Sequence, residues 1–167
     1  MSEAQTYMSP GTLGFLIVAI VSLPLTLAQF LEKGGPTAQF FEVAGVILFL
    51  IGVWAWKCSD NFAFTVFGVA GAAIFLTGFG MGYWENIAFA VFFAFSVVWA
   101  IIIKGPKNLV LLLINTTLVF LFVGLSAEEV IGGDYWRWLI GAAGLGNFIF
   151  TFYMGMSCAA PQVFKPF

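Results

Sequence analysis

The side chains that carry most enzyme chemistry are scarce in this chain. It contains no histidine, so haem or chlorophyll sites ligated by histidine are excluded, as are copper or zinc clusters built on histidine. Cys58 and Cys158 stand far apart and form no CxxC pattern, which predicts two reduced thiols rather than a metal or haem site. No apolar segment carries an acid pair or a nucleophile beside a base. We therefore expect no enzyme, no bound metal and no cofactor.

Neutral polar side chains are present instead, inside long apolar stretches. An asparagine facing lipid would leave its amide unpaired, so Asn115 and Asn147 should face protein or water. Hydrogen bonds between helices would explain why such residues occur in apolar segments. Thr116 and Thr117 would then also bond to carbonyl groups of their own helix. Alternatively, they line a narrow path for a small polar or anionic solute. The candidate lining residues are Asn115, Thr117, Asn147, Thr65 and Phe64.

These residues must be positioned by helices that lie in lipid. Of the 167 residues, 62% are hydrophobic and 8% are charged, whereas a soluble domain carries about 25% charged residues. The mean hydropathy is +1.04. So few charges cannot keep the surface of a globule in water, so the surrounding solvent must be lipid. The chain has no basic stripe, which excludes nucleic acid as a partner.

The charges and turn residues divide the chain into apolar segments of the length that a membrane requires. A hydrocarbon core about 30 Å thick needs roughly 20 residues of helix per crossing. We expect an all-α integral membrane protein, a single transmembrane domain over residues 1–167. The N-terminus has no cationic region before its first apolar run, so we expect no cleavable signal peptide. The predicted helices cover residues 13–30, 40–56, 62–83, 87–103, 109–125 and 138–156.

The distribution of positive residues predicts the orientation. With six crossings both termini lie on one side, and that side holds Lys57, Lys104, Lys107 and Lys165. The opposite side holds Lys33 and Arg137, together with the acidic residues Glu32, Glu42, Glu85, Glu128, Glu129 and Asp134. Because cytoplasmic loops carry the excess of Lys and Arg, both termini should be cytoplasmic.

Small residues gather in two of the segments. The third carries Gly68, Gly71 and Gly78 among alanines, and the sixth carries Gly141 and Gly144. Close approach of backbones favours small residues at helix interfaces in lipid. We therefore expect the third and sixth segments to be the tightly packed interior helices. Their glycines either serve packing alone or leave room for a pore.

Four stretches, in order along the chain, resemble motifs of the acetate/succinate transporter family. Ser9-Pro10-Gly11-Thr12-Leu13-Gly14-Phe15 is similar to its opening Asn-Pro-Ala-Pro-Leu-Gly-Leu signature, with matches at Pro10, Leu13 and Gly14 and with Ser9 in place of Asn. Asp60-Asn61-Phe62-Ala63-Phe64-Thr65-Val66-Phe67, followed by Gly71, resembles its Asn-Thr-Phe-Gly-Leu-Thr-Ala-Phe run. Lys104-Gly105-Pro106-Lys107-Asn108-Leu109 is similar to its short basic turn, and Trp138 with Gly144 matches its spacing in the last helix.

This resemblance implies a six-helix protomer that assembles into a hexameric ring, with a separate pathway through each protomer. In the family, Phe, Tyr and Leu side chains from the first, third and fifth helices form a narrow constriction. Those positions fall on Val18, Ala70 and Thr116 here.

The function expected is a channel or transporter for acetate or a similar small monocarboxylate, either passive or proton-linked, in a cell membrane of the prokaryotic inner-membrane type. The alternative is a structural or accessory subunit of a larger membrane complex without transport activity. A urea or amide channel of similar hexameric build is a further reading, by analogy of fold alone. The expected partners are a small carboxylate, membrane lipids, further copies of the chain and other membrane subunits.

Overall fold

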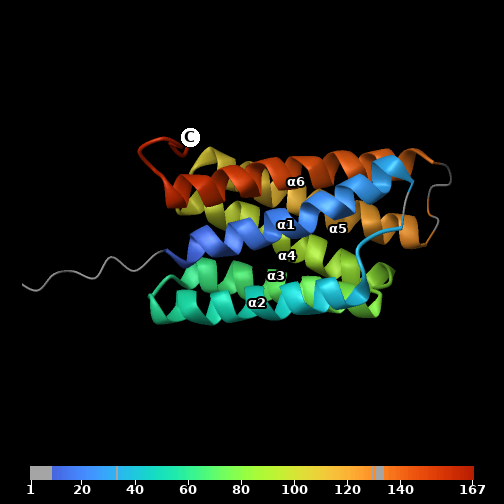
Figure 1. Cartoon of the computed structure of the whole chain (residues 1–167), viewed down its shortest axis with the longest axis horizontal. Coiled ribbons are helices and arrows are strands. Elements are labelled where there is room, and N and C mark those ends of the chain that lie inside the picture. The colour runs from blue at the N-terminus through green and yellow to red at the C-terminus, as the bar shows by residue number, and fades with distance from the viewer. Residues whose placement is uncertain (1–8, 33, 129, 131–133) are drawn as a thin grey trace, which may run out of the picture.

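The computed structural model describes residues 9–32, 34–128, 130 and 134–167 (Figure 1). Lys33 and Glu129, which enter the charge distribution above, lie outside the described residues. The described part of the chain forms helices and no strands. In order, the helices are α1 (Pro10–Leu31), α2 (Ala38–Lys57), α3 (Asn61–Phe79), α4 (Tyr83–Ile102), α5 (Lys107–Ala127) and α6 (Tyr135–Ala159).

All six of these helices are long and apolar enough to cross a membrane, with lengths of 19 to 25 residues. The prediction of an all-α protein with six membrane helices is therefore confirmed, and the chain is a multi-pass membrane protein. The start of α1 and the C-terminal end of the chain lie at the same end of the bundle (Figure 1). We call this end the terminal end and the other the loop end.

Residues at the helix starts explain why several helices begin where they do. The Ser9 hydroxyl accepts a hydrogen bond from Gly11 N at 3.3 Å, and Pro10 occupies the first turn, where its missing N–H costs nothing. Asp60 caps α3 by accepting from Ala63 N at 2.9 Å. The capped first turn places the start of α1 three residues before the predicted Leu13. The family-like motif residues Ser9, Pro10, Leu13 and Gly14 thus form the beginning of α1.

The third predicted helix was too long at its C-terminal end. Helix α3 ends at Phe79 rather than at Tyr83, and Tyr83 instead begins α4. Gly80 has a φ of 82°, in the left-handed region that glycine adopts without strain, and Gly82 is extended. Two glycines two residues apart therefore end one helix and start the next. Asn86 therefore lies inside α4, near its start.

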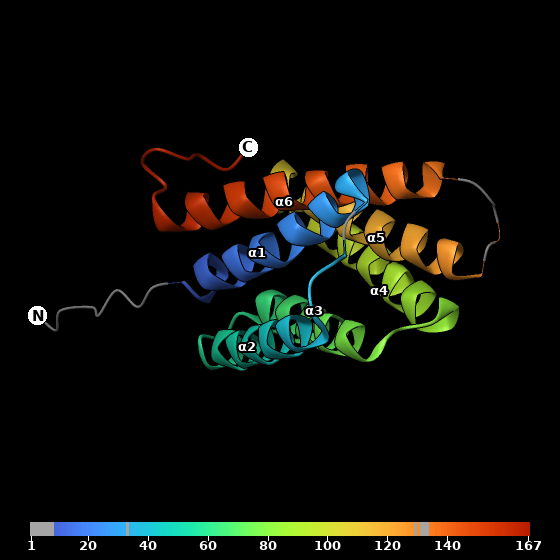
Figure 2. The ribbon, with the colours of Figure 1, turned by 45° about the vertical axis from the view of Figure 1, so that its right-hand side comes forward.

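The helices pack as pairs, α2 with α3, α1 with α6 and α4 with α5. Figure 2 shows the α2–α3 pair as a unit set apart from α5 and α6. It meets the rest of the bundle mainly through α1, and Phe62 of α3 also contacts Trp99 of α4, with ring centroids 5.1 Å apart. Helix α6 buries the largest share of its length, as expected. The expectation for α3 was wrong, because α3 packs mainly on α2 at the side of the bundle. Gly45 and Gly52 of α2 provide the surface that its glycines meet.

Candidate functional site

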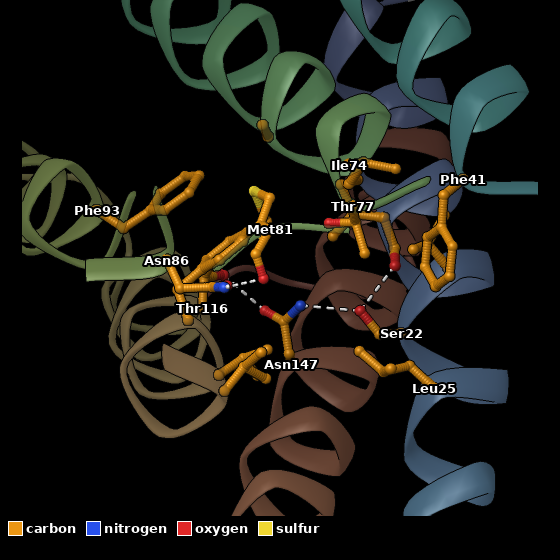
Figure 3. A pocket seen from close by; sticks show the side chains of 16 residues that line it. Ser22, Leu25, Phe41, Ile74, Thr77, Met81, Asn86, Phe93, Thr116 and Asn147 are labelled. Carbon is orange, nitrogen blue, oxygen red and sulfur yellow. Dashed lines mark hydrogen bonds between the residues drawn. The ribbon is translucent and has the colours of Figure 1, made fainter. Parts of the chain in front are cut away.

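A cavity of about 140 Å³ lies between the α2–α3 pair and the rest of the bundle (Figure 3). All six helices and the α3–α4 connection contribute to its wall. Four lining residues come from α1 and four from α5, with the remainder from the other elements. They are Val18, Val21, Ser22, Leu25, Phe41, Ala70, Ile74, Thr77, Met81, Asn86, Phe93, Thr116, Val119, Phe120, Val123 and Asn147.

Three buried polar side chains on this wall form a hydrogen-bonded bridge between helices α1, α5 and α6. Asn147 donates from Nδ2 to Ser22 Oγ at 2.8 Å, and Thr116 donates from Oγ1 to Asn147 Oδ1 at 2.7 Å (Figure 3). Ser22 in turn donates to Val18 O at 2.8 Å. Thr116 Oγ1 also lies 3.0 Å from Leu112 O, so its single proton has two acceptors within reach. The amide of Asn147 therefore ties three helices together at the cavity.

Asn86 carries the second buried side-chain amide on the wall, and within the described part of the chain only the NH₂ group of this amide has hydrogen-bond partners. Its side chain is 1% exposed. Nδ2 donates to Gly82 O at 2.8 Å and to Met81 O at 3.3 Å, which holds the α3–α4 connection against α4. Its Oδ1 has no hydrogen-bond partner among the described residues. Buried polar atoms are nearly always paired, so an unpaired acceptor inside the bundle is a feature that needs an explanation.

The rest of the cavity wall is apolar. Phe93 and Phe120 stack with their rings 5.5 Å apart and almost parallel, and Phe41 covers the side formed by α2. No charged side chain of the described residues lines the cavity. A site without a compensating charge suits a small solute that is neutral or only partly polar, because an unpaired ion in a low-dielectric interior is costly.

The structure brings together four of the residues that the sequence singled out. Val18, Ala70 and Thr116 come from three different helices, and all three line the cavity together with Asn147. Ala70, Thr116 and Asn147 are buried, and Val18 is half-buried. The three positions where the resemblance placed a constriction therefore surround one space.

The other candidate lining residues lie elsewhere in the bundle. Asn115 is half-buried, donates to Leu111 O at 2.8 Å and packs against Gly146. Thr117 donates to Leu113 O and faces an outer groove between α4 and α5. Successive residues of a helix are rotated by about 100°, so both side chains point away from the direction of Thr116. The remaining two, Thr65 and Phe64, do not line the cavity either; Thr65 bonds to Asn61 O and Phe64 is exposed.

Sequence reasoning did not place three polar residues on the wall, Ser22, Thr77 and Asn86. Asn86 was assigned to a connection because the segment before it was extended to Tyr83. The pair Gly80 and Gly82 was the signal that could have placed it on a helix. A serine has no distinctive signal inside an apolar helix, since its hydroxyl commonly bonds to the carbonyl four residues before it, as Ser22 does to Val18.

No protein-family model and no curated protein matches the sequence. A solved structure does match, that of the bacterial acetate channel SatP, with a TM-score of 0.80 and 15% sequence identity, over 96% of this chain and 97% of that chain. The chain has the fold of that channel. This confirms the predicted acetate-channel-like architecture, and because the likeness covers nearly all of both chains, it applies to the whole six-helix bundle.

Proposed function

We propose that the chain is the protomer of a membrane channel or transporter for acetate or a similar small monocarboxylate. The observation that carries this proposal is the cavity. It lies inside a bundle with the fold of an acetate channel, and Val18, Ala70 and Thr116 surround it at the positions where the resemblance places the narrow part of the pathway. A cavity of about 140 Å³ offers room for a solute of a few heavy atoms.

We further propose that two aromatic rings close the pathway on the terminal side of the cavity. Phe15 and Phe67 precede Val18 and Ala70 by one helical turn, and they meet edge to face with their centroids 5.0 Å apart. Both are buried, and the Phe67 ring fills the space beside Gly14, where a Cβ would lie 2.6 Å from the ring. Passage toward the terminal end therefore requires that Phe67 moves.

Uptake of labelled acetate into proteoliposomes tests the proposal. Thr116→Trp should fill the cavity and lower protein-dependent uptake at least about tenfold. Thr117→Trp is the matched control, because Thr117 faces the outer groove, and it should retain uptake. Vesicles without protein give the background. Unchanged uptake by Thr116→Trp would show that the route does not pass through this cavity, and a protein that passes neither acetate nor formate, succinate or urea would refute a channel function.

The proposed assembly is a hexameric ring in a prokaryotic inner membrane. This proposal rests on the resemblance of the motifs. Its support in the structure is an apolar outer surface on α2 and α4, with exposed side chains at Phe49, Leu50, Phe95 and Ile102. Native mass measurement in mild detergent should give six copies of the chain. A stable monomer that still passes acetate would separate the channel function from the ring.

The proposed orientation places both termini in the cytoplasm. Cys58 lies in the α2–α3 turn at the terminal end and is exposed, so it is a natural reporter. A membrane-impermeant maleimide should label Cys58 in inside-out vesicles and leave it unlabelled in intact cells, with Cys58→Ser as control. Labelling only from the outside would reverse the orientation.

An accessory subunit without transport is the second candidate, and one observation favours it. The polar side chains of the bridge, Ser22, Thr116 and Asn147, are hydrogen-bonded in a chain through Asn147. Residues that only hold helices together are bonded in this way. This candidate predicts no flux of any tested solute and constant co-purification with other membrane subunits. A homogeneous homo-oligomer that passes acetate would rule it out.

A further inference from the structure

The wall of the cavity consists mostly of hydrocarbon side chains. Of its sixteen lining residues, eleven are apolar, and these come from α1 to α5 and from the α3–α4 connection. Leu25, Phe41, Ile74 and Phe93 lie around the polar bridge in Figure 3. A solute that enters the cavity therefore touches apolar side chains over most of its surface.

The polar lining residues form their hydrogen bonds within the protein. The hydroxyl groups of Ser22, Thr77 and Thr116 donate to protein acceptors, and so do the side-chain amides of Asn86 and Asn147. A solute must compete with these bonds, so the polar groups distinguish poorly between solutes that carry the same head group. The apolar wall can distinguish them, because it responds to the size of their apolar part.

The volume of the cavity sets the size of the apolar group that fits. The cavity measures about 140 Å³. An engineered apolar cavity of roughly 150 Å³ binds benzene. Butyrate has as many heavy atoms as benzene, whereas acetate has two fewer. Acetate would therefore leave part of the apolar wall without contacts, and butyrate would cover it. Each methylene group that moves from water to an apolar environment strengthens binding about fourfold.

We infer that the cavity binds four-carbon monocarboxylates more tightly than acetate, with the alkyl chain against the apolar wall, an inference that rests on the proposed function. The acids from acetate to hexanoate share one carboxyl group of nearly the same acidity. The cost of placing that group in the cavity therefore cancels in the comparison. Two added methylene groups should make butyrate bind about fifteenfold more tightly than acetate. Hexanoate exceeds the cavity and should gain nothing over butyrate.

Competition against labelled acetate measures this preference. Protein-dependent initial uptake into proteoliposomes is recorded with unlabelled acetate, propionate, butyrate or hexanoate at equal concentration on both sides of the membrane. Diffusion of the competitor through the lipid then changes neither pH nor volume. Propionate should inhibit at about fourfold and butyrate at about fifteenfold lower concentration than acetate. Equal potency of acetate and butyrate would overturn the inference. So would a gain that continues to hexanoate, since it would indicate adsorption to lipid or to the outer surface.

A pair of alanines in α3 assigns the preference to the cavity. Ala70 lines the cavity, whereas Ala72 lines an outer groove between α2 and α3. Ala70→Val narrows the cavity and should reduce the preference for butyrate over acetate to about fourfold or less. Ala72→Val is the matched control and should keep the full preference. A full preference in Ala70→Val would overturn the assignment. If that variant does not fold, Val18→Ile, on the same wall, replaces it.

Equilibrium binding separates this inference from the proposed function. Calorimetric titration of the purified protein in mild detergent with each acid requires no transport. Tighter binding of butyrate than of acetate, without uptake of any acid, supports the inference and refutes the channel. Acetate uptake without a preference for butyrate, in either binding or competition, overturns the inference while the channel function stands. A protein that neither binds nor passes any of the acids overturns both.

Discussion

The two sides of the cavity are held together by different physical means. On one side, α2 and α3 approach so closely that a Cβ on Gly71 would lie 2.6 Å from Phe49 N and 2.8 Å from Gly45 O, both of them backbone atoms. On the other side, α1, α5 and α6 are joined by the side chains of Ser22, Thr116 and Asn147. Helices α2 and α3 are therefore in contact through their backbones at glycines, whereas α1, α5 and α6 are joined by hydrogen bonds between side chains.

This difference explains how the helices can be held firmly together and still leave a cavity between them. Lipid gives helices no hydrophobic reason to associate, so close backbone packing and hydrogen bonds replace it. The glycine contact joins α2 and α3 into one thick unit, and this unit meets the remaining helices mainly through α1. The cavity occupies the gap that is left. We therefore expect changes in the α2–α3 contact to affect folding, and changes on the cavity wall to affect passage.

The largest effect on stability should follow from one added methyl group in the glycine contact. Gly71→Ala would force two helix backbones apart, because the atoms nearest to the new Cβ are Phe49 N and Gly45 O and no side chain can move away. We expect a loss of about 2–3 kcal/mol in the free energy of unfolding, the usual cost of overpacking. Unfolding in mixed detergent micelles measures it.

Gly68→Ala is the matched control on the same helix. A Cβ at Gly68 would meet nothing within 4 Å. Because alanine is the better helix former, this variant should be unchanged or more stable by about 0.5–1 kcal/mol. Equal losses from both substitutions would mean that the α2–α3 contact is looser than described.

The second prediction concerns passage. In Ala70→Leu the larger side chain should fill part of the cavity, so protein-dependent uptake of acetate should fall about tenfold, equivalent to about 1.4 kcal/mol in the barrier. The free energy of unfolding should change little. Ala73 is fully buried on the same helix and is not on the cavity wall. Ala73→Leu should instead destabilise the protein by about 1–3 kcal/mol. If Ala70→Leu is the less stable of the two, the space beside Ala70 is not open.

These residues also show how far the sequence alone leads. The six helices follow from composition and length, and Asn147 and Thr116 were identified because a polar group at membrane depth must find a partner. The sequence does not show which of Asn115, Thr116 and Thr117 faces the cavity. Three adjacent residues of a helix point in three directions, and only the packing of the neighbouring helices determines which direction faces the interior. Gly45 and Gly52 were overlooked because isolated glycines in α2 show no pattern until α3 lies against them.

The third prediction concerns the hydrogen-bonded side. Asn147→Ala removes both bonds of the bridge, yet Ser22 and Thr116 keep acceptors on their own helices at Val18 O and Leu112 O. No hydroxyl proton is left unpaired, so the loss should be only about 1 kcal/mol, with hydrogen bonds between membrane helices averaging about 0.6 kcal/mol. Asn115→Ala is the control, because among the described residues the Asn115 amide bonds within α5, to Leu111 O. A larger loss from Asn115→Ala would place the principal helix contact outside the cavity.

The smallest effect should come from the adjacent threonines of α5, of which Thr116 lines the cavity and Thr117 faces the outer groove. Thr116 donates across to Asn147, whereas Thr117 donates only to Leu113 O of its own helix. Valine has almost the shape of threonine, so Thr116→Val should cost about 0.6 kcal/mol and Thr117→Val nearly nothing. A double-mutant cycle with Asn147→Ala isolates the bond itself. A coupling energy near zero would show that Thr116 gives its proton to Leu112 O, which leaves Asn147 Oδ1 as a second unpaired acceptor inside the bundle.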